Sequence, residues 1–282
     1  MRLITRTVVA GVALAQLTIG QTSNPSIEQL SDAIEKFPEL FLFRSLLAKA
    51  PSDVDIAFDG KEKGITVLVP TNDAIGSYLV DQNVTTLDDV GPEELKAILE
   101  YHVMDAPLKG DDFDGPRGIV IPTRLTDEKF NNRSAGELLR DKFGDSGLGQ
   151  VLFALKEKTS MRTLRSRQEL GTLTGPLVKI RAGLKQDVKM TAVDGTWGPE
   201  KLNTFQVVDK VLVPPRNCST TIRSVAEKKL SALDKALTKV NMWPTLNTAF
   251  NVTCLAPTSD AFRDAGSPQD NAGDDELRQS LL

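Results

Sequence analysis

Residues 144–147 and the single histidine of the chain, His102, are the first candidates for catalysis. The segment Gly144-Asp-Ser-Gly147 resembles the surroundings of a protease serine. A catalytic triad needs a base that takes the serine proton and a carboxylate that orients that base. His102 is the one histidine available, but its sequence context is unlike that of a protease histidine. We therefore assign no catalytic residue, and an enzyme that uses Ser146 and His102 is the least favoured hypothesis.

Metal and cofactor sites have little support in the sequence. One histidine and two cysteines do not supply a zinc cluster by themselves. The acidic segment Asp111-Asp-Phe-Asp114-Gly115 offers hard oxygen ligands, but the spacing and the bidentate glutamate of an EF-hand are missing. We interpret it as an exposed acidic turn. No metal and no cofactor are predicted.

The stretch 156–189 is a candidate binding surface. It holds nine basic and three acidic residues, in a chain whose formal net charge is −4. Such a local excess of positive charge attracts anionic polysaccharide or phospholipid headgroups. A solvated insertion or strand edge is the alternative, because no aromatic residue interleaves to stack on sugars or bases. The residues that would bind an anion are Arg162, Arg165, Arg167, Lys179 and Arg181.

The N-terminus predicts secretion. Two arginines precede the apolar run 8–17 and small residues follow it, so residues 1–20 have the pattern of a signal peptide cleaved before Gln21. Cleavage after Ala15 is the alternative. The run is too short to cross a bilayer, and no other stretch is long and apolar enough, so no transmembrane segment is predicted. The residues given do not encode the hydrophobic tail of a GPI anchor.

Export makes four sequons candidate glycan sites and two cysteines a candidate disulfide. After a signal peptide, each Asn-x-Ser/Thr sequence is a plausible glycan site; these are Asn83, Asn132, Asn217 and Asn251. Cys218 and Cys254 enter an oxidising compartment, where a disulfide between them would stabilise the fold by about 4 kcal/mol in the chain-entropy model. Two buried free thiols are the alternative, because the sequence does not fix the distance between them.

The composition is that of a folded, mildly acidic protein. The 282 residues, 40% of them hydrophobic and 26% charged, fit about two globular domains and exclude a wholly disordered chain. A net charge of −4 and an isoelectric point near 5.3 argue against a nucleic-acid-binding protein.

Helices are predicted before strands. Apolar spacing in 26–50 predicts two helices broken near Pro38, and 86–103 predicts another. The β-branched run 65–69, ended by Pro70, predicts a buried strand, and Thr71 or Asp73 caps the short helix that follows. Later strands are predicted at 118–122, 177–182, 188–192 and 205–213. This order of elements predicts an α+β fold.

A long-range repeat is the most informative feature of the sequence. The segment 65–75, ITVLVPTNDAI, recurs as 252–262, VTCLAPTSDAF. A helical pattern precedes each copy and an acidic helix start follows each. The repeat predicts a tandem protein, with one domain over 26–215, a linker at 216–221 and an incomplete second copy over 222–282. That second copy would expose apolar side chains such as Phe250, Leu255 and Phe262.

Three motifs in this order resemble the fasciclin (FAS1) family. Thr66-Val-Leu-Val-Pro-Thr-Asn-Asp-Ala74 (box 1) resembles the first signature of that family, and Tyr101-His102 its short Tyr-His motif. Val207-Val-Asp-Lys-Val-Leu-Val-Pro214 (box 2) resembles the second signature. Residues 253–261 (the box 1 repeat) open the second copy. Two departures stand out, an apparent insertion at 114–175 and Gln206, where box 2 often carries histidine.

The resemblance implies an α+β module, a β-sandwich or wedge with packed helices, followed by an incomplete second copy. It also implies a non-catalytic extracellular role in adhesion to matrix or cell-wall polymers or to cell-surface proteins. We predict that the motif residues are structural, not a binding site; these are Thr71, Asn72, Asp73, Ala74, Tyr101, His102, Asp209, Pro257, Thr258 and Asp260.

Overall fold

The computed structural model describes most of the chain after residue 24. The described residues are 25–60, 63–130, 137–144, 149–156, 176–183, 185–225, 228–249 and 254–282. The predicted signal peptide, two sequons (Asn132 and Asn251), Ser146, Phe250 and three of the predicted anion-binding arginines (Arg162, Arg165 and Arg167) lie outside these residues. None of the described helices is both long enough and apolar enough to span a membrane.

One sheet organises residues 25–216, which we call the sheet module. Its seven strands run in the order β2-β1-β7-β6-β5-β4-β3. β1 pairs in parallel with β7, and the other neighbours are antiparallel. The strands are β1 (Thr66–Pro70), β2 (Val103–Met104), β3 (Ile119–Pro122), β4 (Val151–Lys156), β5 (Leu177–Ala182), β6 (Lys185–Trp197) and β7 (Asn203–Val208).

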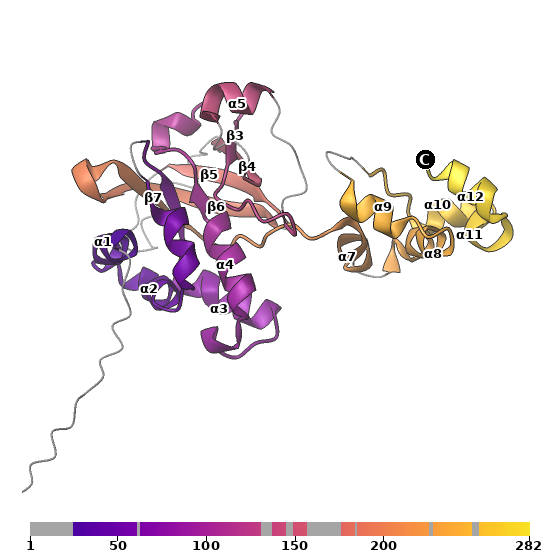
Figure 1. Cartoon of the computed structure of the whole chain (residues 1–282), viewed down its shortest axis with the longest axis horizontal. Helices are drawn as coiled ribbons and strands as arrows, with labels where there is room; N and C mark the ends of the chain where they lie inside the picture. Colours follow the sequence, from indigo (N-terminus) through magenta and orange to yellow (C-terminus); the bar gives the residue numbers. More distant parts are fainter. Residues whose placement is uncertain are drawn as a thin grey trace, which may run out of the picture.

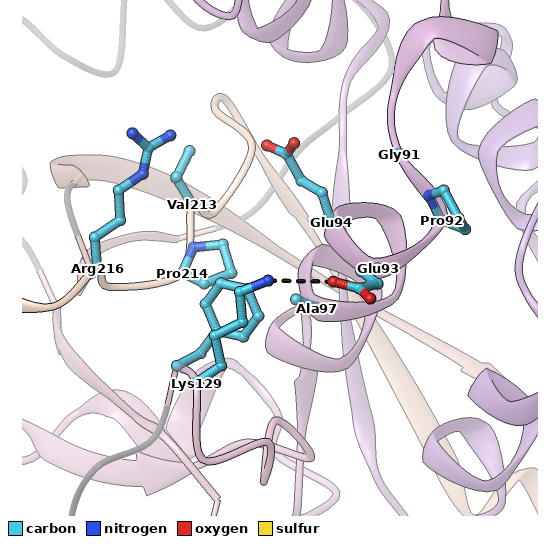
Figure 2. A pocket seen from close by; sticks show the side chains of 10 residues that line it. Gly91, Pro92, Glu93, Glu94, Ala97, Lys129, Val213, Pro214 and Arg216 are labelled. Atoms are coloured by element: carbon cyan, nitrogen blue, oxygen red, sulfur yellow. Dashed lines mark hydrogen bonds and ion pairs between the residues drawn. The ribbon is translucent and has the colours of Figure 1, made fainter. Parts of the chain in front are cut away.

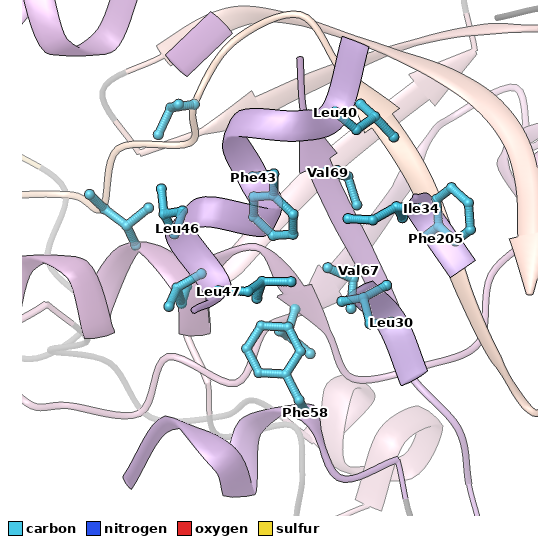
Figure 3. Close-up of a cluster of buried hydrophobic side chains, with 14 of the residues drawn as sticks. Leu30, Ile34, Leu40, Phe43, Leu46, Leu47, Phe58, Val67, Val69 and Phe205 are labelled. Carbon is cyan, nitrogen blue, oxygen red and sulfur yellow. The ribbon is translucent and has the colours of Figure 1, made fainter. Parts of the chain in front are cut away.

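Helices cover one side of this sheet, as Figure 1 shows. α5 (Glu137–Phe143) lies away from this layer in Figure 1. The helices of the layer are α1 (Pro25–Ile34), α2 (Phe41–Leu47), α3 (Asn72–Asp81) and α4 (Pro92–Tyr101). Their apolar faces meet the alternate residues Val67 and Val69 of β1 and Phe205 of β7 in one buried cluster (Figure 3). A second cluster, with Leu68, Ile180 and Met190, fills the opposite side of the curled sheet. The α+β fold class is confirmed.

Residues 218–282 form a separate helical body, which we call the helical unit (Figure 1). Its helices are α7 (Cys218–Arg223), α8 (Ser231–Lys239), α9 (Trp243–Thr248), α10 (Ser259–Asp264), α11 (Pro268–Asn271) and α12 (Asp274–Ser280). Leu237, Trp243, Phe262 and Leu277 are among the side chains of its own buried core. No strand occurs among its described residues.

Several sequence expectations need correction. The expected linker 216–221 is largely helical, because α7 begins at Cys218. The expected insertion 114–175 contains β3 and β4, which are strands of the sheet, and its status as an insertion stays a prediction. The expected strand 205–213 ends at Val208, although Val211, Leu212 and Val213 are buried. In the helical unit, Leu255 is 87% exposed as expected, whereas Phe262 is buried, because it packs into the helical core.

Candidate functional site

The three motifs of the sheet module meet around His102. The N–H of Leu68 in box 1 donates to the His102 carbonyl at 2.8 Å. The N–H of Leu212 in box 2 donates to His102 Nε2 at 3.1 Å, and His102 Nδ1 lies 2.7 Å from the Ile98 carbonyl. Since Nε2 accepts, Nδ1 carries the proton and donates. One side chain thus joins the end of α4 to the segment after β7.

His102 has no free nitrogen for catalysis. Its side chain is fully buried, and burial lowers its pKa to about 4, so the imidazole is neutral at physiological pH. Both ring nitrogens are engaged with the backbone. A general base needs a nitrogen that reaches the reacting proton. The histidine is therefore placed as a structural cross-link.

Box 1 is a strand-to-helix connection. Thr71 Oγ1 accepts from the Ala74 N–H at 3.2 Å and is the N-cap of α3. Asn72 Oδ1 accepts from the Leu42 N–H at 2.8 Å, and its Nδ2 donates to the Pro38 carbonyl at 2.9 Å. The cap satisfies an end of α3 that has no intrahelical partner. The asparagine fixes α3 to the start of α2.

The other motif residues of the sheet module also serve the fold. Tyr101 is buried, and desolvation raises its pKa above the usual range. Asp209 Oδ1 accepts from the Lys189 N–H at 2.7 Å, which fixes box 2 to β6. Ala74 is buried between helix and sheet, whereas Asp73 is exposed. These positions agree with the predicted structural role, which stays a prediction until the residues are changed.

The box 1 repeat has the same connection. Thr258 Oγ1 accepts from the Ala261 N–H at 3.2 Å and is the N-cap of α10. Ser259 stands where box 1 has Asn72: its hydroxyl accepts from the Ala232 N–H at 3.2 Å and donates to the Lys228 carbonyl at 3.1 Å. In both copies the side chain after the cap bridges a carbonyl and the N–H four residues later, at the start of an earlier helix, which is α2 for Asn72 and α8 for Ser259.

Of the remaining repeat residues, Pro257 differs in burial from its counterpart Pro70, which is buried, whereas Asp260 is exposed like Asp73. Pro257 is exposed, and Asp260 forms an exposed ion pair with Arg263 at 2.8 Å. Cys218 and Cys254 are both free thiols in the structure, so it does not contain the expected disulfide. Burial and the nearby Cys218 raise the pKa of the Cys254 thiol. The pairing stays a prediction.

Two of the four sequons are described, and both asparagines are exposed. Asn83 follows α3 with a φ of +56°, a left-handed conformation that asparagine tolerates well. Asn217 is the N-cap of α7, where its Oδ1 accepts from the Thr220 N–H at 2.9 Å. This bond uses the carbonyl oxygen of the amide, whereas a glycan is attached at the nitrogen.

The basic stretch contributes a positive face to the sheet. Lys179 and Arg181 alternate with the buried Val178 and Ile180 along β5, so they point away from the core. Lys189 of β6 pairs directly with Lys179. No ion pair to these three cations occurs among the residues that the structure describes. Lys156, in contrast, is paired with Asp114.

A recess of about 510 Å³ lies at the start of α4 (Figure 2). Its volume is within the usual range for small-ligand pockets. Glu93 and Lys129 form an ion pair at 3.2 Å on its rim, and Glu94 Oε1 accepts from the Tyr78 hydroxyl at 2.8 Å. No sequence pattern indicates this recess, because its walls come from three distant segments, 91–97, 129–130 and 213–216.

The family model for the Fasciclin domain matches residues 38–131. The chain contains a fasciclin domain. The matched residues run from η1 (Pro38–Leu40) past β3 and include box 1 and the Tyr-His motif. The resemblance to the fasciclin family is therefore confirmed, and it supports an adhesion-related role for the chain.

One similar solved structure is a FAS1 domain pair from the insect cell adhesion molecule Fasciclin I. It is 15% identical, with a TM-score of 0.39, and the match covers 86% of this chain and 70% of that chain. No curated protein sequence matches this fasciclin-domain chain.

Proposed function

We propose that this chain is a secreted, glycosylated adhesion protein that attaches to extracellular-matrix or cell-wall polymers, or to cell-surface proteins, without catalysis. The fasciclin domain carries the proposal. The engagement of Thr71, Asn72 and His102 in backbone hydrogen bonds supports a structural use of the motifs. Contacts with partners would then come from the outer surface of the module, not from a catalytic cleft.

The proposed secretion and glycosylation rest on the N-terminal sequence and the sequons. Exposure of Asn83 and Asn217 supports their use as glycan sites. Secreted from a eukaryotic cell, the chain should begin at Gln21 and shift in mass on glycosidase treatment. Asn83→Gln should remove one glycan, and Asp81→Asn, which creates no sequon, serves as the control. Retention inside the cell, or an unmodified secreted chain, contradicts this part of the proposal.

The adhesive role is tested with the secreted, mature chain on an array of glycans and matrix proteins. Retention on at least one class of matrix or wall polymer is expected. Thermally unfolded protein is the control, because unfolding destroys the folded surface that makes the contacts. A blank array from well-folded protein contradicts the adhesive role.

The domain organisation extends this proposal. We infer that a second fasciclin-like copy, expected over 222–282, begins earlier, with α7 at Cys218. The matching bridges of Asn72 and Ser259 support this relation, since both fix a capped helix to the start of an earlier helix, α2 in the first copy and α8 in the second. Paired substitutions of Asn72 and Ser259, compared for their cost in stability, test it.

A second candidate function is binding of anionic glycans or anionic lipid headgroups. The observation in its favour is the outward-facing group of Lys179, Arg181 and Lys189, which lie on neighbouring strands. Like charges placed opposite each other on a sheet repel, so an anion that bridges them would relieve this cost. Arg162, Arg165 and Arg167 belong to the same basic stretch.

Retention on heparin and on vesicles that contain phosphatidylserine tests this candidate at increasing salt. Arg181→Glu should lower the salt concentration of elution, because screening weakens exposed charge contacts. Lys36→Glu, an exposed lysine close to α1, is the matched control. Reversal of Arg162, Arg165 and Arg167 probes the rest of the stretch. Retention that is insensitive to salt, or equal loss in the control, contradicts the candidate.

A further inference from the structure

The recess at the start of α4 combines an apolar lining with charged groups of both signs. Ala97, Val213 and Pro214 contribute buried apolar surface to it, and Phe130 is half-buried beside them. A mostly apolar lining with a few polar groups is the usual composition of a small-ligand site. The charged side chains that line the recess are exposed; these are Glu93, Glu94, Lys129 and Arg216.

Two of these four charges satisfy each other, and two have capacity left for a ligand. Glu93 and Lys129 form an ion pair at 3.2 Å. Glu94 uses Oε1 to accept from the Tyr78 hydroxyl at 2.8 Å, and its Oε2 has no partner among the residues that the structure describes. Arg216 forms no ion pair with any described residue. One carboxylate and one guanidinium therefore remain to bind opposite charges.

Arg216 lies close to the bonded pair of Tyr78 and Glu94. Burial raises the pKa of the Tyr78 hydroxyl above its usual range, and Glu94 raises it further, whereas the positive charge of Arg216 acts in the opposite direction. Such an effect falls with distance, so the guanidinium lies near this hydroxyl. In the view of Figure 2, Val213 stands between Arg216 and Glu94. The two unsatisfied charges thus flank apolar surface.

The wall that carries Arg216 is held in place by its backbone. Segment 213–215 passes so close to Gly183 that an added Cβ there would lie 2.2 Å from the Val213 carbonyl oxygen. The two prolines of the segment restrict its backbone further. The Thr221 hydroxyl donates to the Arg216 carbonyl at 3.2 Å. A preformed wall lowers the ordering cost of binding a ligand.

We propose that this recess binds a short apolar peptide with free ends, two or three residues long, whose ammonium group meets Glu94 and whose carboxylate meets Arg216. Such a zwitterion offers one charge to each unsatisfied group, whereas a ligand with a single charge would leave one of them without a partner. The planar guanidinium suits a carboxylate because it can donate two parallel hydrogen bonds. The apolar side chains of the peptide would cover Val213, Pro214 and Phe130.

This inference goes beyond adhesion, because it assigns a small ligand and not a polymer or a cell-surface protein. The size of the recess, about 510 Å³, favours a peptide over a single amino acid. Free leucine carries the same two charges with less apolar surface, so it should bind more weakly than the dipeptide Leu-Leu.

Isothermal titration calorimetry of the full chain with Leu-Leu tests the proposal. We expect saturable binding with a Kd of about 0.1–1 mM. Three control peptides each lack one feature: N-acetyl-Leu-Leu has no ammonium group, Leu-Leu-amide has no carboxylate, and Gly-Gly has no apolar side chains. Each should bind about fivefold more weakly or worse.

Two variants show which group of the protein meets which end of the peptide. Glu94→Gln keeps an acceptor for the Tyr78 hydroxyl and should weaken Leu-Leu binding about fivefold, after which acetylation of the peptide should cost little more. Arg216→Gln should do the same for the carboxylate end. Glu137→Gln and Arg117→Gln, at exposed positions outside the recess, are the matched controls and should leave binding unchanged.

Absence of saturable binding up to about 10 mM Leu-Leu overturns the proposal. Equal binding of the acetylated and amidated peptides also overturns it, because the two ends would then make no contact with opposite charges. The same holds if the control variants lose as much affinity as Glu94→Gln and Arg216→Gln, since the ligand would then bind elsewhere.

Discussion

Box 1 and its repeat share six of nine residues but differ in structure. Each has a threonine cap 3.2 Å from the N–H that it binds, and each has a polar side chain that bridges to the start of an earlier helix, α2 or α8. In the sheet module the residues before the cap form β1, whereas the same residues before Thr258 form no strand within the described range. The cap depends on neighbours in sequence, but the strand depends on β7, which is distant in sequence.

The largest expected difference between the copies concerns their matching leucines. Leu68→Asp places a charge in the core and should reduce the free energy of unfolding of the sheet module by more than about 4 kcal/mol. Leu255→Asp, at an exposed position, should change the stability of the helical unit by less than about 0.5 kcal/mol. Urea unfolding followed by hydrogen exchange measures the free energy of unfolding of the sheet module and of the helical unit separately. Similar losses at both positions would mean that Leu255 is covered in solution.

The second prediction concerns pH and only the sheet module. Burial lowers the pKa of His102 to about 4, so between pH 6.5 and 4 the unfolded state binds a proton that the folded state does not. This linkage reduces stability as the pH falls, by about 1.4 kcal/mol per pH unit. Burial raises the pKa of Glu100 to about 7, so between pH 7 and 4.5 the folded state binds the extra proton and stability increases as the pH falls.

These two effects oppose each other between pH 6.5 and 4.5. The wild-type sheet module should therefore change little in stability over this range, whereas Glu100→Gln should lose about 1 kcal/mol per pH unit as the pH falls. Urea titrations at several pH values measure the slope. Asp73→Asn, at an exposed position on α3, is the control. A flat profile in the Glu100→Gln variant would mean that His102 does not titrate in this way.

The third prediction tests the shared bridge. Asn72→Ala leaves the Leu42 N–H and the Pro38 carbonyl without their partner and should reduce the stability of the sheet module by about 1–3 kcal/mol. Ser259→Ala should reduce the stability of the helical unit by about 1–2 kcal/mol for the same reason. Ser77→Ala and Gln279→Ala, both exposed, are the controls. No loss in Ser259→Ala would argue against the second copy.

The smallest expected effect is on the caps. Thr71→Ala and Thr258→Ala should each cost about 1 kcal/mol, because each removes one N-cap hydrogen bond. Thr→Ser at either position retains the hydroxyl and should restore most of the loss. Chemical unfolding of the single variants measures both the loss in Thr→Ala and its recovery in Thr→Ser. Costs that differ widely would show that the two connections are not energetically equivalent.

The contrast between box 1 and its repeat shows how far the sequence predicts the structure. The β-branched runs of β1 and β5 predict strands close to their observed bounds, since local pattern determines them. β4 falls in the expected insertion. Gly147 and Gly149 precede Val151–Lys156, but its short run of Val, Leu, Phe and Ala does not by itself distinguish a strand from a helix. The repeat alone would place a strand before Thr258, but the described residues there form none, because a strand needs a partner that local sequence does not contain.

In the candidate site, too, the sequence does not predict which distant segments come together. The sequence predicts the motif residues and a structural role for them, and the structure adds their backbone partners, such as Leu212 for His102. The recess at the start of α4 is not predicted, since 91–97, 129–130 and 213–216 have no common sequence signal. The positive face is predicted only as a charged stretch. Its geometry depends on the pairing of Lys179 with Lys189.

The parallel pairing of β1 with β7 also means that β1 waits for its partner strand during synthesis. Thr66 pairs with Thr204, so the ribosome makes β1 long before its partner strand exists. At about 5–20 residues per second this delay is roughly 7 to 28 seconds. During that interval the nascent chain has the helices that flank β1 but not the neighbour that β1 requires. A chaperone that shields apolar strands would have this interval in which to act.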